Sequence, residues 1–209
     1  MVSCYISRDS LNDFVVCNSK TTDAIGYHRI STVVLVTDFF KVMAGEAPSQ
    51  RGRVVMQQCL SARLQVKPPS DTEEAEYVEI SRGTVIYICF LKGADSSTVE
   101  KMAKATMNVR LSESENGKFI SILDLPGDVL VVPQATLGGK AKGKMMQYHS
   151  NIAKEQGLEL YNAYIEQTRK ILDGHAKWKE AACTLKHGTY GNRQVLRMDT
   201  NGPYHYFEF

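Results

Sequence analysis

Alternating hydrophobic positions mark the start of a regular region near residue 53. Apolar side chains recur at nearly every second position from Val54 to Val66, and the pair Pro68-Pro69 follows. This period is typical of a half-buried strand, and prolines are rarely tolerated inside one. The pattern predicts one long strand over residues 53–66.

Continuous apolar runs predict buried strands further along the chain. Residues 84–91 are rich in β-branched and aromatic side chains, and residues 129–132 are all Val or Leu. Such runs are typical of central strands that are covered on both faces. Residues 77–80, 181–186, 194–198 and 204–209 are also expected to form strands, and Asn116-Gly117 predicts a tight turn.

Two segments have helical periodicity instead. Asp95 or Ser96 can cap the first helix, and Ser97 and Glu100 have the spacing of a capping box. The second helix is expected over residues 154–172. The buried faces are expected to comprise Val99, Met102, Ala103, Thr106 and Met107 in the first helix and Leu158, Tyr161, Ile165 and Leu172 in the second.

Strands combined with two main helices predict an α+β fold. Before residue 53 the pattern differs, because short apolar runs alternate with polar breaks and residues 45–52 are rich in Gly, Pro and polar side chains, as linkers are. We therefore expect residues 1–52 to form an N-terminal extension and linker, and residues 53–209 to form the functional domain. The extension is a partly ordered appendage, a disordered tail or an artefact of gene prediction.

Composition narrows the class of protein. A hydrophobic content of 43% with 23% charged residues is ordinary for a globular domain, and the net charge of +2 gives no overall attraction to nucleic acid. The five cysteines include no CxxC, which favours reduced thiols in a cytoplasmic protein. No apolar stretch approaches the roughly 20 residues that span a membrane, and no secretory or mitochondrial leader is indicated.

A glycine- and lysine-rich segment over residues 138–145 imitates a phosphate-binding loop. Met145 stands where that loop requires a Ser or Thr to ligate Mg²⁺, so nucleotide hydrolysis is not expected. The segment is then either a solvated basic turn or a contact to an RNA backbone through Lys140, Lys142 and Lys144.

Other catalytic patterns are weak in this sequence. There is no GxSxG motif, and Cys183 and His187 are four residues apart in a strand-like segment, a spacing that does not bring them together. The histidines lack HxxxH or HExxH spacing, so neither a metal nor a cofactor is expected. Thr136 has no adjacent base, which makes it a weak nucleophile, and a threonine paired with the backbone is an equal interpretation.

Two short segments carry a family resemblance. One is Pro133-Gln134-Ala135-Thr136-Leu137-Gly138-Gly139, after a predicted strand, and the other is Asn201-Gly202-Pro203. Together they resemble the two signature motifs of the D-aminoacyl-tRNA deacylase family. Residues 53–60, 116–118, 122–127 and 187–196 also match, so the resemblance covers roughly residues 53–209. Pro133 in place of the family's Ser, and Tyr204-His205 after the Gly-Pro, are similar to the animal-type branch.

The resemblance implies a fold and a mode of catalysis. The fold is a partly closed β-sheet structure with two main helices, which forms a homodimer with its active sites at the subunit interface. Gln134, Ala135 and Thr136 position the aminoacylated 3′ end of tRNA, and the main-chain N–H groups of Ala135 and Thr136 stabilise developing negative charge. The 2′-hydroxyl of the terminal adenosine helps water to attack the ester.

The resemblance also implies a selectivity element, formed by Asn201-Gly202-Pro203 beside Pro133. In D-specific relatives the Gly-Pro bond is cis and its carbonyls exclude L side chains, whereas in the animal-type branch it is trans. We expect Gln58, where D-specific relatives have Arg, and Arg63, where they have a small residue, to brace this loop. The alternatives are a simple Gly-Pro turn and two solvated strand side chains. Tyr148 packs near the terminal adenine or in the core.

The resulting prediction is a cytoplasmic, homodimeric enzyme that proofreads mischarged tRNA by hydrolysing its ester. A single methyl group is worth only about 1–3 kcal/mol in a pocket, so near-neighbour amino acids need separate editing. The expected substrates are L-Ala on tRNA(Thr) first, then glycyl- and D-aminoacyl-tRNA. The alternatives are a strict D-aminoacyl-tRNA deacylase and a non-catalytic tRNA-binding module. Neither DNA nor a membrane is an expected partner.

Overall fold

The computed structural model describes residues 2–9, 12–23, 26–35, 50–200 and 202–209. The chain divides into two compact units, Met1–Ser49 and Gln50–Phe209. In the first unit the strands β1 (Val2–Asp9), β2 (Asn12–Asp23) and β3 (Gly26–Leu35) form an antiparallel sheet in that order. Most of the predicted linker, residues 45–49, lies outside the described residues.

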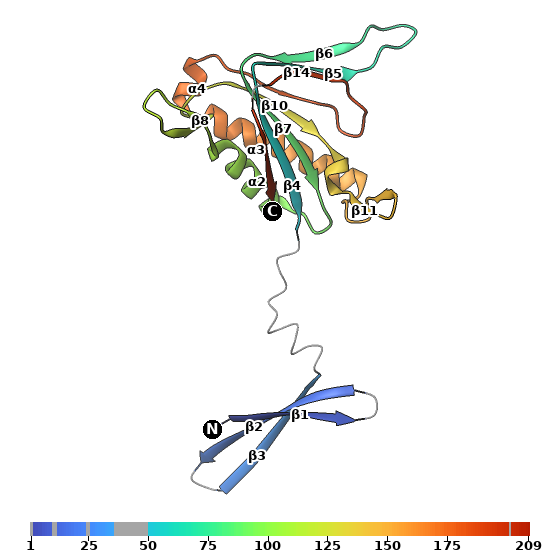
Figure 1. Ribbon diagram of the computed structural model, residues 1–209, viewed down its shortest axis with the longest axis vertical. Coiled ribbons are helices and arrows are strands. Elements are labelled where there is room, and N and C mark those ends of the chain that lie inside the picture. Colours follow the sequence, from blue (N-terminus) through green and yellow to red (C-terminus); the bar gives the residue numbers. More distant parts are fainter. Residues whose placement is uncertain (1, 10–11, 24–25, 36–49, 201) are drawn as a thin grey trace. The chain divides into compact units, whose positions relative to one another are not determined.

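A mixed five-stranded sheet with the order β13-β10-β7-β4-β15 is the centre of the second unit (Figure 1). The strand β10 runs parallel to β7 and β13, while β4 runs antiparallel to β7 and β15. The two continuous apolar runs form β7 and β10 and are buried, as predicted. The strands are β4 (Gly52–Cys59), β7 (Gly83–Phe90), β10 (Asp128–Pro133), β13 (Leu185–His187) and β15 (Tyr204–Glu208).

A three-stranded antiparallel sheet covers one face of the central sheet. It has the order β14-β5-β6, with β5 (Ser61–Lys67), β6 (Glu76–Ile80) and β14 (Leu196–Asp199). The two sheets share a small hydrophobic core, because the apolar faces of their strands meet there. This core comprises Cys59, Ala62, Leu64, Ile80, Val85, Leu130 and Val132.

Helices cover the opposite face of the central sheet. They are α2 (Ser96–Asn108), α3 (Lys154–Asp173) and the short α4 (Ala176–Glu180). The larger core lies between α2, α3 and the central sheet, and Figure 1 shows the two long helices side by side across the strands. Inside it, the Thr106 Oγ1 and Tyr164 OH atoms lie 2.8 Å apart and join the helices.

Three short features complete the second unit. The hairpin β8 (Arg110–Glu113) to β9 (Phe119–Ser121) turns at Gly117, where φ is 71°, in agreement with the predicted Asn-Gly turn. The 3₁₀ helix η1 (Ala135–Gly138) follows β10 directly. The hairpin β11 (Lys140–Lys142) to β12 (Met145–Gln147) comes next and turns at Gly143. The glycine- and lysine-rich segment 138–145 therefore forms a hairpin and not a phosphate-binding loop.

Several expectations about individual elements are wrong. The predicted long strand is two strands in different sheets, because the chain bends at Leu60, whose side chain is 56% exposed. Leu158 is 44% exposed, although the rest of the expected face of α3 is buried. The helix α4 was not predicted. The α+β class with two main helices is confirmed, and the described strands of the second unit form several hydrogen-bonded sheets.

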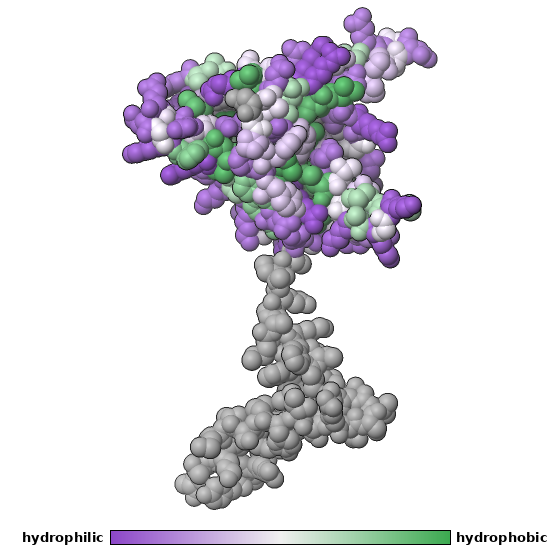
Figure 2. Space-filling model, in the orientation of Figure 1, coloured by the Kyte–Doolittle hydropathy of each residue, from purple (hydrophilic) through white to green (hydrophobic). Residues whose placement is uncertain are grey.

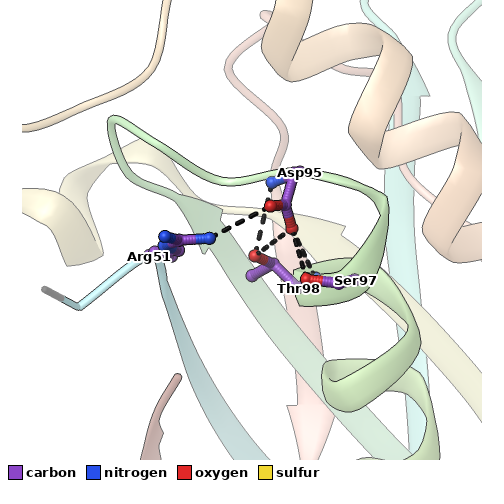
Figure 3. A network of polar contacts seen from close by, with 4 residues as sticks. All are labelled: Arg51, Asp95, Ser97 and Thr98. Atoms are coloured by element: carbon purple, nitrogen blue, oxygen red, sulfur yellow. Dashed lines mark hydrogen bonds and ion pairs between the residues drawn. The ribbon is translucent and has the colours of Figure 1, made fainter. Parts of the chain in front are cut away.

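The cap of α2 also differs from its expected form. Asp95 is the N-cap, and its carboxylate accepts hydrogen bonds from the Thr98 N–H at 2.9 Å and the Ser97 hydroxyl at 2.7 Å (Figure 3). The Asp95 N–H donates to Thr98 Oγ1, so Thr98 rather than Glu100 completes the capping box. Arg51 adds an ion pair to Asp95 at 3.0 Å. The network joins the start of α2 to the segment that leads into β4.

Candidate active site

The turn after β10 lies beside the largest described cavity, with a volume of about 970 Å³. The first signature segment supplies Pro133, Gln134, Ala135 and Thr136 to its wall, as the sequence resemblance implied. The remaining wall comes from β5, β7, the end of β10, residues 151–154 at the start of α3, and the loop 190–195. The lining residues are Gln65, Ile88, Cys89, Phe90, Val132, Pro133, Gln134, Ala135, Thr136, Asn151, Ile152, Lys154, Tyr190, Gly191, Asn192, Arg193, Gln194 and Val195.

The backbone of η1 is held from two directions. Arg53 of β4 donates from Nη1 to the Leu137 carbonyl at 2.7 Å. Asn151 donates from Nδ2 to the Ala135 carbonyl at 2.8 Å. Gly138 makes this approach possible, since a Cβ atom there would lie 1.9 Å from Asn151 Oδ1. These contacts fix the turn relative to the central sheet.

Two main-chain amides and one hydroxyl are available at this turn. The N–H groups of Ala135 and Thr136 open η1, where no intrahelical acceptor exists, and no acceptor for them occurs among the described residues. Gln134 donates from Nε2 to Thr136 Oγ1 at 2.7 Å, which leaves the hydroxyl proton of Thr136 free to donate. The turn therefore presents donors suited to an oxygen that gains negative charge.

The described lining of the cavity contains no group that commonly acts as a general base. Among its described lining residues there is no Asp, Glu or His, and the two charged side chains are Lys154 and Arg193. Burial raises the pKa of the Cys89 thiol to about 11, so it is neutral near pH 7 and a poor nucleophile. The site is suited to holding a polar, negatively charged substrate rather than to supplying a base or a nucleophile.

The loop 188–195 contributes residues 190–195 to the cavity wall, and the sequence pattern predicted no role for it. Gln194 fixes the loop, because its Oε1 accepts from the Thr189 N–H at 2.9 Å and its Nε2 donates to the Thr189 carbonyl at 2.8 Å. Tyr161 of α3 donates to the Gly188 carbonyl at 2.9 Å, and its ring lies 5.6 Å from that of Tyr190. The only sequence signal was that this stretch matched the family.

The second signature segment lies elsewhere in the same chain. Gly202 and Pro203 are not among the residues that line the cavity, and Asn201 lies outside the described residues. No described peptide bond is cis, so the Gly202–Pro203 bond is trans. Buried Gln57, which is 3% exposed, donates from Nε2 to the Gly202 carbonyl at 3.3 Å.

The two residues expected to brace this loop have different contacts. The Gln58 side chain donates to Ser112 Oγ at 2.8 Å, although its main-chain carbonyl accepts from the Thr200 hydroxyl at 2.8 Å. Arg63 pairs with Glu79 at 2.9 Å and lies 3.8 Å above the Tyr77 ring. The side chain that reaches the loop is that of Gln57. Gln57 and Gln58 are adjacent in β4, so their side chains point to opposite faces of the strand.

The remaining predicted residues lie on or near the β11–β12 hairpin. Lys140, Lys142 and Lys144 are exposed, and Met145 beside them is 73% exposed. Tyr148 is also exposed and packs close to Gly139, where a Cβ atom would lie 2.7 Å from its ring. It is close in sequence to the signature turn but does not line the cavity.

Comparison with known proteins identifies the family. The family model described as D-Tyr-tRNA(Tyr) deacylase matches residues 55–207. The chain belongs to this family. The D-aminoacyl-tRNA deacylase 2 of Gallus gallus is 60% identical over 158 residues, which cover 75% of this chain and 95% of the relative. That of Homo sapiens is 52% identical over 168 residues, which cover 80% of this chain and all of the relative.

Solved structures agree with this family assignment. A structure described as a probable eukaryotic D-amino acid tRNA deacylase has a TM-score of 0.62 and 26% identity, and it covers 76% of this chain and 99% of that chain. The c-Myc DNA Unwinding Element Binding Protein has the same TM-score with 25% identity over 75% of this chain and 98% of its own. The expected resemblance to the animal-type branch, and to an ester hydrolase of aminoacyl-tRNA, is confirmed.

No group of three or more His, Cys, Asp or Glu side chains in the described residues has the arrangement of a metal site. No described helix has the length and apolar character that crossing a membrane requires.

Proposed function

We propose that this chain is a trans-editing deacylase whose preferred substrate is L-alanine esterified to tRNA(Thr), and that it also cleaves glycyl- and D-aminoacyl-tRNA. Family membership supports the class of reaction. The observation that carries the proposal is the cavity beside η1, where the N–H groups of Ala135 and Thr136 have no acceptor among the described residues and the described wall contains no carboxylate or histidine.

Catalysis would depend on position rather than on a protein base. The ester carbonyl oxygen would accept hydrogen bonds from the N–H groups of Ala135 and Thr136, which would stabilise the charge that forms as water attacks. Gln134 would hold the adenosine or the amino acid. Because the wall offers no base, the 2′-hydroxyl of the terminal adenosine would assist the attacking water. An RNA hydroxyl held beside the ester supplies its group at high effective concentration.

The Gly202–Pro203 loop supports relaxed chiral selectivity. In D-specific relatives a cis Gly-Pro bond directs carbonyls at the substrate and excludes L side chains. Here the bond is trans, and the Gly202 carbonyl accepts a hydrogen bond from Gln57 of its own chain. With that carbonyl engaged inward, a small L side chain such as that of alanine would have room. This geometry disfavours the strict D-aminoacyl alternative.

A homodimer would complete the site. In one chain the Gly202–Pro203 loop does not line the cavity that contains Thr136, so both signature segments can meet only if a partner supplies one of them. The adjoining strand β15 is an edge of the central sheet, with Tyr204 67% and Tyr206 52% exposed. Figure 2 shows hydrophobic and hydrophilic residues of the second unit interspersed on the visible face.

The β11–β12 hairpin would contact the RNA backbone. Its exposed Lys140 and Lys142 begin two residues after η1, and Lys144 lies in its turn. Lysines at this distance from the reacting ester would neutralise phosphates close to the 3′ end and make tRNA binding dependent on salt.

The decisive experiment measures deacylation of three substrates by the full chain. L-Ala-tRNA(Thr) is expected to be cleaved rapidly, D-Tyr-tRNA(Tyr) more slowly, and correctly charged L-Thr-tRNA(Thr) is expected to be spared. A matched L-Ala-tRNA(Thr) with 2′-deoxyadenosine at its end is expected to resist cleavage, because it lacks the assisting hydroxyl.

Three results would contradict parts of this proposal. Cleavage of the D-aminoacyl ester alone would restore strict chiral specificity. Rapid cleavage of the 2′-deoxy substrate would exclude assistance by RNA. Binding of tRNA without any hydrolysis above buffer would leave only a tRNA-binding module.

A further inference from the structure

A second cavity lies on the exposed face of the sheet β14-β5-β6, next to the candidate active site. Its volume is about 270 Å³, and it is lined by Arg63, Gln65, Tyr77, Val195 and Arg197. Gln65 and Val195 also line the larger cavity. The two cavities therefore share a wall, and a ligand that extends out of the larger one can reach the smaller.

Two arginines are placed opposite each other in this second cavity. Arg63 of β5 and Arg197 of β14 are direct partners in the antiparallel register. Residues paired in this way have Cβ atoms about 4.5–5.5 Å apart, and like charges at such positions destabilise a sheet. An anion bound between the two guanidinium groups would remove this repulsion.

The described residues place little negative charge beside the guanidinium groups of Arg63 and Arg197. Arg63 pairs through Nε with the exposed Glu79, and its two Nη atoms make no hydrogen bond in residues 50–200 and 202–209. Within the same residues, Arg197 has neither a hydrogen-bond partner nor a carboxylate at ion-pair distance. Arg63 is also held in place, because it lies over the Tyr77 ring and Gln65 donates to Tyr77 OH at 3.3 Å.

We propose that Arg63 and Arg197 together bind a phosphate of the tRNA backbone while the aminoacylated end occupies the larger cavity. The planar guanidinium group matches the geometry of phosphate oxygens and can donate two hydrogen bonds at once. This inference rests on the proposed function, since it takes tRNA as the substrate. The site is separate from the lysine hairpin, because β11 lies apart from β5, β6 and β14 in Figure 1.

The test is binding of uncharged tRNA(Thr) to the full chain across a series of salt concentrations. Arg197→Gln is expected to weaken binding about tenfold, as loss of a hydrogen bond to a charged group does. The slope of log Kd against log salt is expected to decrease by about 1, since one phosphate contact is lost. Arg197→Lys should retain the slope but not the full affinity, because it keeps the charge without the planar fork.

Arg110→Gln is the matched control. Arg110 is an exposed arginine of β8 that lines neither cavity, so its loss changes the net charge equally. This variant is expected to bind tRNA with the affinity and salt slope of the unaltered chain. Thermal unfolding of each variant establishes that its fold is intact.

Two outcomes would overturn the phosphate site. One is that Arg197→Gln behaves like Arg110→Gln in affinity and slope. The other is that Arg197→Gln converts dimers to monomers in sedimentation with an unchanged slope, which would make this face a subunit contact. If the unaltered chain binds tRNA with an Arg197-dependent slope but hydrolyses no ester, the phosphate site stands and the deacylase proposal falls.

Discussion

The Ala135 carbonyl has two side-chain neighbours that differ in strength as donors. Asn151 Nδ2 donates to it at 2.8 Å, whereas Cys89 Sγ lies 3.6 Å away and a thiol is a weak donor. The carbonyl of residue 135 and the N–H of Thr136 belong to one planar peptide group. The side chain that holds the carbonyl therefore also aims the Thr136 amide into the cavity.

Separate substitutions of Asn151 and Cys89 distinguish a side chain that positions the turn from one that would react with the substrate. Asn151→Ala is expected to lower kcat by about 10²-fold, the effect of a displacement near 1 Å at a reacting group. Its thermal stability should change little, because the Asn151 Oδ1 atom is buried without a hydrogen-bond partner in the described residues. Single-turnover deacylation and thermal unfolding measure the two effects.

Cys89→Ala is the matched control for this prediction. It is expected to remain close to the unaltered chain in kcat, since the pKa of the thiol is about 11 and its contact to Ala135 is weak. Loss of a covalent nucleophile costs on the order of 10⁶ in kcat. A loss of that size in Cys89→Ala, or none in Asn151→Ala, would contradict the assigned roles.

At the scale of elements, the network around Asp95 controls the start of α2. Hydrogen bonds from Ser97 and Thr98, with the nearby Arg51 guanidinium, hold the pKa of the Asp95 carboxyl well below its usual range. A carboxyl whose pKa is lower in the folded than in the unfolded chain stabilises the fold above its unfolded pKa, about 3.9. That contribution disappears as the pH falls through the folded pKa.

Asp95→Ala is therefore expected to lower the urea midpoint of unfolding at pH 7. The difference from the unaltered chain should stay constant down to about pH 5 and shrink below about pH 4, because Asp95 of the unfolded chain binds a proton there while the folded cap is still ionised. Asp71→Ala, in an exposed loop without a described hydrogen bond, should shift the midpoint little at any pH. A difference that grows in acid would contradict the assigned cap.

Sequence periodicity predicted the elements that bury a continuous or helical apolar face, namely β7, β10, α2 and α3. It failed at Leu60, because alternation continues through a bend that moves the chain from one sheet to another. It also did not separate Gln57 from Gln58, since neighbouring strand residues face opposite sides and only the packed sheet shows which side meets Gly202.

The candidate site was predictable only in part for a related reason. The signature turn follows directly from β10, so local sequence located it. The loop 188–195 reaches the same cavity from more than 50 residues away, through contacts such as Tyr161 to Gly188. No local pattern encodes that meeting, and the phosphate-binding pair depends equally on the register of β5 and β14.

At the scale of the whole molecule, the separation of the two signature segments makes a strong test possible. A Cβ atom at Gly202 would meet no heavy atom within 4 Å, and Gly202 has no left-handed backbone that would strain a larger residue. Gly202→Leu should therefore fold normally. If its loop enters the partner's cavity, the leucine would occupy the substrate space there and abolish hydrolysis. Ala135 is an exposed residue of the cavity wall, so Ala135→Leu should abolish hydrolysis by blocking the cavity of its own chain.

Mixing these two inactive variants with subunit exchange distinguishes a shared site from a site within one chain. In a symmetric dimer, half of the exchanged molecules would be mixed dimers, each with one site damaged twice and one intact. Activity should therefore return to about a quarter of that of the unaltered chain. Absence of recovery, with mixed dimers demonstrated by mass, would place each site within one chain. Recovery would mean that Gly202–Pro203 selects substrate in the partner's cavity, because only an exchanged loop could restore it.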